Sequence, residues 1–545
     1  MESKEDYEAT SRATPEPEVY PGQSRTMGDE SGGIKRDLSS RHINMIAIAG
    51  MIGTGLSLSS GSVIATAGPA GALLAYIVMG LATAGVSYTT GEITSFMPAT
   101  GGFIRHATKF VEPALGAATG WNFWYTMSIS VPAEISAAAT LVQFWNDSVN
   151  PAVWITIFLI FIIVINFCGV RLYGETEVVF ASLKIMTIVG LIIGGLVINL
   201  GGGPNHERLG FRYWQDPGAF NSYLVPGSAG GFLAFWKVLL SAAFSYGNIQ
   251  VVAISGSETR NPRQIIPAAT RKTFFRVFVF YVLSILVVGM IVPSNDPALS
   301  VSTGTAQQSP FVIAFTRSGV SVLPSIINAV VCTSAISSGS ACVFIASRTL
   351  YGLSCDGHAP KLFQRCNRFG TPHYAVGLTC VLFPLVYLNV ANNTSVVFGW
   401  FVNITTVAGL IGWIVIEVTY LRFYAGLKAQ GYSRKDLPYK SPGQPYVPWI
   451  TVLFVALVVF FSGFDVFTTG NFTASGFLTC YLNVFIFAAL YIFFKLYLKS
   501  KVISPDEMDF ESEFASIRQE KAEADMFGSR KTGIKATLQR VVHSV

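Results

Sequence analysis

Four ionisable residues lie inside or at the ends of long apolar blocks of this chain, and they are the first candidates for chemistry. They are Glu92, Glu134, Lys184 and Glu417. A charge in such surroundings costs a few kcal/mol or more, so each side chain pairs, exchanges a proton or contacts a polar ligand. Each of the four is therefore a functional candidate by default.

The three acids have different alternatives. For Glu92, we favour a structural role in which it bonds to neighbouring helix ends. Glu134 follows Pro132, which frees a backbone carbonyl, so both a substrate or proton role and a structural role stay open. Glu417 lies about one turn from Arg422, and a structural pair is favoured there over a substrate contact.

Lys184 lies in the apolar stretch VVFASLKIMTIVG, about two helical turns beyond Glu177. Burial disfavours the ammonium form of lysine, so its charge could change during a reaction cycle. The alternative is that the long side chain reaches the membrane surface. A later block adds the hydroxyls of Thr333, Ser334, Ser337 and Ser338, which could line a cation or proton site or simply pack helices.

Two apolar blocks are interrupted near their middles. The first, 43–67, contains Gly50, Gly53 and Gly55; the other, 229–257, contains Ser245, Gly247, Asn248 and Gln250. Interrupted segments at corresponding places in two halves of a chain indicate a transporter site. Their free N–H groups suit a carboxylate and their free carbonyls suit an ammonium group, which a zwitterion would satisfy together. Close helix packing through small residues is the alternative.

The composition of the 545 residues requires a membrane protein. Hydrophobic residues make up 51% and charged residues 12%, about half the charge of a soluble domain. These values exclude a soluble enzyme, a secreted disulfide domain, a coiled coil and a disordered chain. The seven cysteines show no metal or disulfide spacing. The net charge of +6 lies in loops, so it does not indicate nucleic acid.

The hydropathy pattern predicts an all-α polytopic membrane protein with twelve transmembrane helices. The expected spans are 43–67, 70–97, 113–145, 152–169, 178–200, 229–257, 273–293, 321–354, 375–390, 395–421, 446–465 and 477–498. Loops after even-numbered spans carry sixteen Lys and Arg residues, against three in loops after odd-numbered spans. Positive charge marks the cytoplasmic side, so both termini are expected there.

Several polar motifs between the spans resemble those of the fungal amino-acid permeases (YAT-type) of the amino acid–polyamine–organocation superfamily. The stretches are GMIGTGLSLSSG (50–61), YTTGEITSFMPATGGF (88–103), SETRNPRQIIPAA (257–269), ASRTLYGLSCDGHAPKLF (346–363) and DLPYKSP (436–442). With the order of spans, the resemblance covers residues 40–510. It implies a leucine-transporter-type fold with two inverted five-helix repeats plus two helices, and proton-coupled amino-acid uptake at a plasma membrane.

Residues 1–40 are polar and rich in Glu and Pro, so a disordered cytoplasmic tail is expected there. The inverted repeats that the resemblance implies then divide the chain into a first repeat (41–200), a second repeat (201–424), spans 11 and 12 (425–499) and a C-terminal tail (500–545). In that tail Phe510, Phe514 and Ile517 recur at helical spacing and predict an amphipathic helix under the bundle. By analogy with the family, Lys4 and Lys35 are candidates for modification by ubiquitin-ligase machinery.

Carried over to this sequence, the resemblance places the substrate carboxylate at the N–H groups of Gly53, Thr54 and Gly55. It places the rest of the substrate site in the segment FSYGNIQ, with Phe244, Ser245, Tyr246, Asn248 and Gln250. This segment departs from the FSFQGTE common in the family, and Gln250 replaces the usual Glu. The resemblance also makes Lys184 the leading proton-coupling candidate, with Glu134, Ser337 and Ser338 beside it.

These observations favour a proton-coupled importer of amino acids. A transporter of carnitine or polyamines, or a nutrient sensor with the same pocket, remains open. No HExxH or GxSxG motif occurs, so an enzyme is disfavoured. The expected partners are a small zwitterionic or cationic solute, protons and membrane lipids. No cofactor, metal or nucleic acid is expected.

Overall fold

The computed structural model describes residues 53–99, 101–146, 148–168, 170–251, 262–300, 309–320, 322–391, 394–520 and 522. Helices and turns, without a strand, make up these residues. Eight of their helices are long and apolar enough to cross a membrane, and two shorter apolar helices cover 151–167 and 446–460. The structure is therefore an all-helical, multi-pass membrane protein, and the count of twelve crossings stays a prediction.

The helices follow the order of the expected spans. The first half contains η1 (Gly55–Ser59), α2 (Ser60–Phe96), α3 (Phe103–Phe110), α4 (Pro113–Val142), α5 (Pro151–Phe167), α6 (Val170–Asn199) and η2 (Trp214–Gly218). The next part contains α7 (Gly227–Ser245), α9 (Pro262–Ile291), α10 (Pro297–Ser300), α11 (Pro310–Arg317), α12 (Leu323–Cys355), η4 (Lys361–Gln364), α13 (His373–Cys380), η5 (Phe383–Tyr387), α14 (Leu388–Ala391) and α15 (Thr394–Ala429). The last part contains η6 (Arg434–Asp436), α16 (Tyr446–Phe460), η7 (Phe464–Phe467), α17 (Ala474–Leu498), η8 (Pro505–Glu507) and a helix over 511–520.

The first two expected spans meet at a sharp turn inside α2. Gly68 has φ of 74°, a conformation that side chains rarely adopt, and Pro69 then starts the next helical segment. The loop at Ala219 fills the turn, because its carbonyl accepts a hydrogen bond from Ala70 N at 2.9 Å. A Cβ on Gly68 would lie 2.7 Å from that carbonyl oxygen. The chain can therefore reverse here only with glycine.

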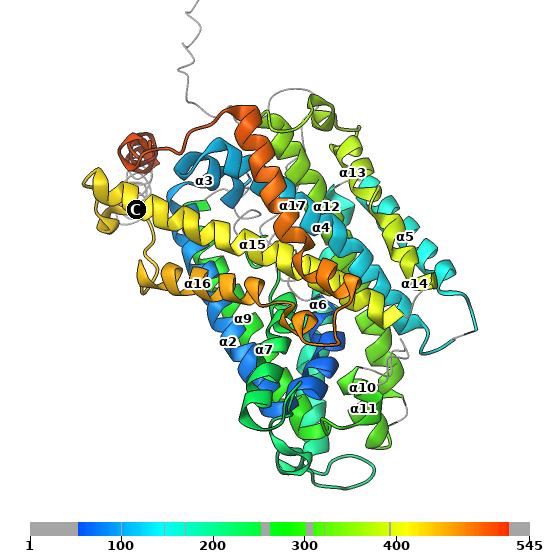
Figure 1. The fold of residues 1–545 in the computed structure, drawn as a ribbon. Helices are drawn as coiled ribbons and strands as arrows, with labels where there is room; N and C mark the ends of the chain where they lie inside the picture. The colour runs from blue at the N-terminus through cyan, green and yellow to red at the C-terminus, as the bar shows by residue number, and fades with distance from the viewer. Residues whose placement is uncertain are drawn as a thin grey trace, which may run out of the picture.

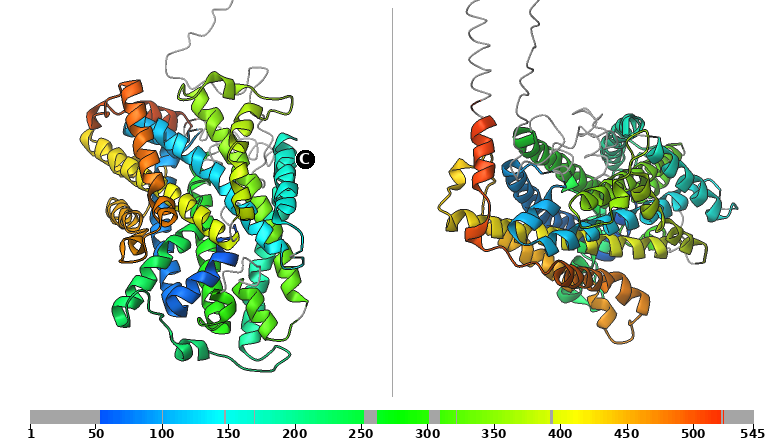
Figure 2. Two further views of the ribbon diagram at one scale, coloured as in Figure 1. Left: turned by 45° about the vertical axis from the view of Figure 1, so that its right-hand side comes forward. Right: turned by 90° about the horizontal axis from the view of Figure 1, so that it is seen from above.

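Two sets of helices form the bundle. In one, α2 packs along α7 and α9; in the other, α12 packs along α4. The long helix α15 crosses α4 and contacts both α16 and α17, as Figure 1 shows. Figure 2 shows α16 and α17 at the periphery of the molecule. The cavity described below lies where the two sets meet.

Glu92 joins the C-terminal end of α2 to α15 and to the segment before α16. It is fully buried, and its carboxylate accepts hydrogen bonds from Tyr420 Oη at 2.8 Å and from Arg434 Nε at 2.9 Å. Ser441 donates through both its backbone N, at 2.7 Å, and its Oγ, at 2.6 Å. These hydrogen bonds together satisfy the buried carboxylate of Glu92. Glu92 therefore has the structural role that the sequence favoured.

The C-terminal tail packs under the same end of α2. Its predicted amphipathic helix is present over 511–520, and Phe510 and Phe514 are buried. The ring of Phe510 stacks on Phe110 with centroids 5.7 Å apart and lies 5.9 Å from Phe96. Arg263, at the start of α9, donates to the Phe96 carbonyl and to Glu520 Oε2 at 3.1 Å. The tail thereby ties α2 to α9.

Some expectations concern residues outside the described ranges. They include the tail over 1–40, the lysines Lys4 and Lys35, and Gly50 of the first interrupted span.

Replacing Phe510 by alanine should destabilise the protein by about 3–5 kcal/mol, because a fully buried aromatic side chain is lost. Thermal unfolding of the detergent-purified protein would measure the change. Val502→Ala is the control, since Val502 is exposed in the same segment. Equal unfolding temperatures for the two variants would contradict the packing described for the tail.

Candidate functional site

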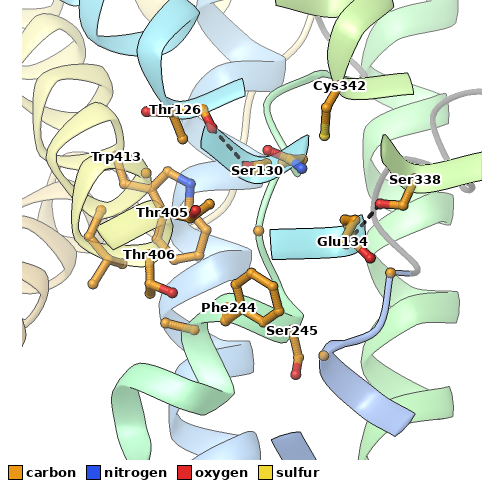
Figure 3. A pocket seen from close by; sticks show the side chains of 17 residues that line it. Thr126, Ser130, Glu134, Phe244, Ser245, Ser338, Cys342, Thr405, Thr406 and Trp413 are labelled. Atoms are coloured by element: carbon orange, nitrogen blue, oxygen red, sulfur yellow. Dashed lines mark hydrogen bonds between the residues drawn. The ribbon is translucent and has the colours of Figure 1, made fainter. Parts of the chain in front are cut away.

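A cavity lies between the interrupted spans. It is lined by Gly53, Gly55, Thr126, Ser130, Glu134, Ala243, Phe244, Ser245, Gly247, Asn248, Ser338, Cys342, Thr405, Thr406, Gly409, Leu410 and Trp413. Figure 3 shows Glu134 and Ser338 on one side and Trp413, Thr405 and Thr406 on the other. Among these lining residues Glu134 is the one with a carboxyl group, and Lys, Arg and His are absent. The cavity is therefore mostly neutral, with one acidic wall.

The first interrupted span starts its helix at the cavity. The Thr54 carbonyl accepts hydrogen bonds from Ser57 N and Leu58 N, at 3.1 and 2.9 Å, so the helical turns begin there. The first N–H groups of a helix have no partner in the helix itself, and they carry its positive end. Gly53 and Gly55 line the cavity at this end. The arrangement suits a carboxylate.

The second interrupted span ends its helix beside the first. Helix α7 stops at Ser245, and Asn248 then has φ of 68°, outside the helical region. Ser245 Oγ lies 2.9 Å from Tyr76 Oη on α2, which fixes the broken end. Tyr246 is buried on the other side, with its ring centroid 5.0 Å from that of Tyr281 on α9.

The start of η1 and the end of α7 touch each other through a glycine. A Cβ on Gly55 would lie 2.8 Å from Ser245 Oγ and 2.9 Å from Ser245 Cα. A Cβ on Gly53 would lie 2.6 Å from Glu134 Oε1. Such distances are too short for any side chain, so the close approach of the two breaks and of Glu134 depends on these glycines.

Glu134 lies on α4 and is almost fully buried. Its Oε1 accepts a hydrogen bond from Ser338 Oγ at 3.0 Å, and the carboxylate also lies close to Thr54. A carboxylate has about four acceptor positions, so Glu134 can still accept bonds from a ligand in the cavity. It can therefore face an ammonium group while α12 holds it in place.

Behind this wall lies a second acid, Glu177 on α6. Its Oε1 accepts a hydrogen bond from Ser337 Oγ at 2.8 Å, and its side chain is 1% exposed. Lys184 is 3% exposed and interacts electrostatically with Glu177 and with Glu134. The amine therefore lies inside the bundle and does not reach the membrane surface. Two neighbouring serines of α12 thus hold two carboxylates around one buried amine.

The rest of the lining, from Ser130 on α4 to the residues of α15, offers neutral polar groups. Ser130 Oγ donates to the Thr126 carbonyl at 2.7 Å, so its oxygen is left to accept from a ligand. Thr405 Oγ1 is buried and has no hydrogen-bond partner among the described residues. Trp413 Nε1 donates to Gln250 Oε1 at 3.1 Å, and Trp413 itself lines the cavity. Gln250 therefore lies one side chain behind the cavity wall.

The residues expected at the site divide into two groups. Those that line the cavity are Gly53, Gly55, Glu134, Phe244, Ser245, Asn248 and Ser338. Thr54, Lys184, Tyr246, Gln250 and Ser337 are buried immediately around it and do not line it. The pairing of Glu417 with Arg422 is not observed among the described residues, and Arg422 instead donates to the Ile503 carbonyl.

Sequence reasoning missed Glu177 and the hydroxyl wall. In the sequence, Glu177 was used only as the reference for how far Lys184 lies inside its span. The two residues are seven positions apart, a spacing that places them on the same face of a helix. That spacing was a usable signal. No sequence signal marked the hydroxyl residues of the cavity, because such residues occur throughout these spans and bond to their own helices. These residues are Thr126, Ser130, Thr405 and Thr406.

Comparison with known protein families identifies the family of this chain. The sequence model described as "Amino acid permease" matches residues 42–504. The chain belongs to the amino acid permease family. It is therefore a membrane transporter that imports amino acids, and permeases as a class are not enzymes.

Relatives of this permease carry different substrate names. It is 42% identical to a "Proline-specific permease" of Emericella nidulans, over 87% of each chain. It is 39% identical to a "Dicarboxylic amino acid permease" of Saccharomyces cerevisiae, over 88% of this chain and 80% of the relative. It is 38% identical to a "Lysine-specific permease" of the same yeast, over 89% of this chain and 79% of the relative.

A solved structure supports the fold. The manganese transporter of Eremococcus coleocola superposes with a TM-score of 0.51 at 14% identity, over 84% of this chain and 94% of that chain. At this identity the likeness concerns the fold alone. The permease thus shares its all-helical fold with that protein, in agreement with the fold class expected from its sequence.

Gly55→Ala should lower uptake at least tenfold while the protein still folds, because the new methyl group separates the two breaks. Gly53→Ala should be milder, since the atom it meets is the end of the Glu134 side chain. Gly190→Ala in α6 is the control, because its Cβ meets nothing within 4 Å. Radiolabelled uptake, normalised to surface protein, tests this order. Wild-type uptake by Gly55→Ala would exclude the site.

Proposed function

We propose that this permease is a proton-coupled importer of small neutral amino acids at the plasma membrane, with both termini in the cytoplasm. The observation that carries the proposal is the position of Glu134. It lies beside the start of the first broken helix, in a cavity whose other lining side chains are uncharged at neutral pH. Both charges of a zwitterion thus have complementary partners close together.

The binding mode follows from these groups. The substrate carboxylate would accept bonds from the N–H groups of Gly53 and Gly55, where the helix dipole is positive, while Thr54 between them faces Glu134. The ammonium group would face Glu134 and the free carbonyls at the break after Ser245. The side chain would then extend toward Phe244, Trp413 and the hydroxyl wall.

The lining argues for a neutral side chain. A lysine or arginine substrate would place a second positive charge in the cavity, and a dicarboxylic substrate a second negative one. The described lining offers no charged partner for either, and an unpaired buried charge is strongly disfavoured. The relatives are named for proline, lysine and dicarboxylic amino acids, so their names do not select one substrate class. The proposal of a neutral substrate therefore rests on the chemistry of the cavity.

The proton coupling is proposed for Lys184. Its buried amine interacts with two acids, Glu177 and Glu134, and Glu134 lies beside the start of η1. Reversible protonation of this amine would add and remove a positive charge at that place. When protonated, it would hold α4 and α6 around the occupied site. Loss of the proton to the cytoplasm would loosen that contact and release the substrate.

An uptake panel tests the substrate class. In a permease-deficient yeast strain, wild-type protein should accumulate L-proline or L-alanine, more at pH 5 than at pH 7, and neither carnitine nor spermidine. Gln250→Glu should raise the ratio of lysine to proline uptake about tenfold, or about 1.4 kcal/mol, because it adds a charge behind Trp413.

Gln519→Glu, exposed in the C-terminal tail, is the control for the added charge. Carnitine or polyamine uptake by the wild type would reject the amino-acid assignment. Saturable binding without uptake would instead indicate a nutrient sensor. A lysine-to-proline ratio unchanged in Gln250→Glu would mean that position 250 does not influence the substrate.

A second prediction concerns coupling. Lys184→Ala and Lys184→Arg should both lose pH-dependent accumulation, since neither side chain can release and rebind a proton, and guanidinium stays charged. Exchange of substrate across the membrane can survive in either. Lys237→Arg on α7 is the matched control and should transport normally, because arginine keeps the ion pair with Asp465. Accumulation by Lys184→Arg with a wild-type pH profile would show that Lys184 is not the coupling group.

A further inference from the structure

Glu177 is a buried acid that the proposed binding mode leaves unused. It lies on α6, two turns before Lys184 and on the same face of the helix. From α12 it faces Ser337, which donates to it at 2.8 Å, and Cys342. From its own helix it faces Lys184 and Tyr173, and Glu134 of α4 lies on the other side of the amine.

The charges of this cluster do not balance when all its groups are ionised. Two carboxylates and one ammonium group leave one net negative charge, and a net charge in the bundle interior is expensive. One additional proton makes the cluster neutral. The proton must then reside on one of the two acids, and only Glu134 lines the substrate cavity.

We propose that Glu177 carries the transported proton, while Glu134 stays ionised opposite the ammonium group of the substrate. This inference rests on the proposed proton-coupled uptake and names a second group in it. A zwitterion adds no net charge to the cavity, so the neutral, proton-loaded cluster and the occupied cavity are compatible. After the site opens inward, Lys184 releases its proton to water and takes up the proton of the Glu177 carboxyl group, which becomes a carboxylate, so the amine is the exchanging group between Glu177 and water.

Helix α12 links the two acids mechanically. Ser337 and Ser338 are adjacent, and successive residues of a helix point about 100° apart, so one turn of α12 contacts Glu177 and Glu134 at once. Movement of α12 against α4 or α6 therefore changes the environment of both carboxylates. A hydroxyl group can donate or accept, so Ser337 can bond to Glu177 in either protonation state.

The test compares three glutamine variants in proteoliposomes with radiolabelled L-proline or L-alanine, whichever the wild type accumulates. Glu177→Gln should lose accumulation driven by a pH gradient at least tenfold, but keep counterflow exchange within about threefold of wild type. Glu134→Gln should lose both, because it contacts the substrate. Glu175→Gln, exposed on the same helix, should behave as wild type.

Accumulation by Glu177→Gln with a wild-type pH profile would overturn the inference. Loss of counterflow together with accumulation, in a monodisperse protein, would also overturn it, because that result indicates a structural or substrate-binding role. A wild type that exchanges substrate but never responds to pH would instead reject the proton-coupled function itself. The two failures are therefore distinguishable.

A second variant keeps the test decisive if Glu177→Gln does not fold. Ser337→Ala preserves the acid but removes a donor that stabilises its ionised form. The pH midpoint of accumulation should then move toward higher pH, by about half a unit or more. Ser338→Ala, which acts on Glu134, should chiefly raise the KM for substrate. An unchanged midpoint in Ser337→Ala would contradict a proton on Glu177.

Discussion

Burial of charge between α4, α6 and α12 is the constraint on which the rest of this permease depends. Glu134, Glu177 and Lys184 each have almost no exposure, so the bundle must supply their partners. Adjacent serines of α12 supply hydrogen bonds to both acids, and the amine supplies opposite charge. A buried cluster of this kind is most stable near neutrality, so its three charged groups constrain one another.

The cavity itself exists because one helix starts where another ends. Glycine at Gly55 allows the start of one helix to touch the end of another at Ser245, and Gly53 allows Glu134 to lie against the same turn. The free backbone groups of both breaks can thus serve one small zwitterion. The remaining walls contribute hydroxyl and aromatic groups, which carry no charge.

Motifs far apart in the sequence meet at the C-terminal end of α2. Glu92 of the motif over 88–103 is bonded to Ser441 of the motif over 436–442. Arg263 of the motif over 257–269 reaches the last carbonyls of α2 and the acidic residues of the C-terminal tail. These polar stretches therefore meet at one end of α2 and connect it to α9, α15 and the C-terminal tail, outside the lining of the cavity.

The sequence by itself determined the membrane class, the family and the break after α7, and it singled out Glu134 and Lys184 as candidates, because hydropathy, glycine spacing and isolated charges are local signals. Only the tertiary structure decided that Glu177 lies with Lys184 and Glu134 in one charge cluster, and that Gln250 is bonded to Trp413 behind the cavity lining. It also decided that hydroxyl groups of α4 and α15 line the same cavity. These facts depend on which faces of distant helices come together. A serine, threonine or glutamine has the same sequence pattern around it whether its side chain faces a ligand or bonds to its own helix. Only the packing of the helices distinguishes the two cases.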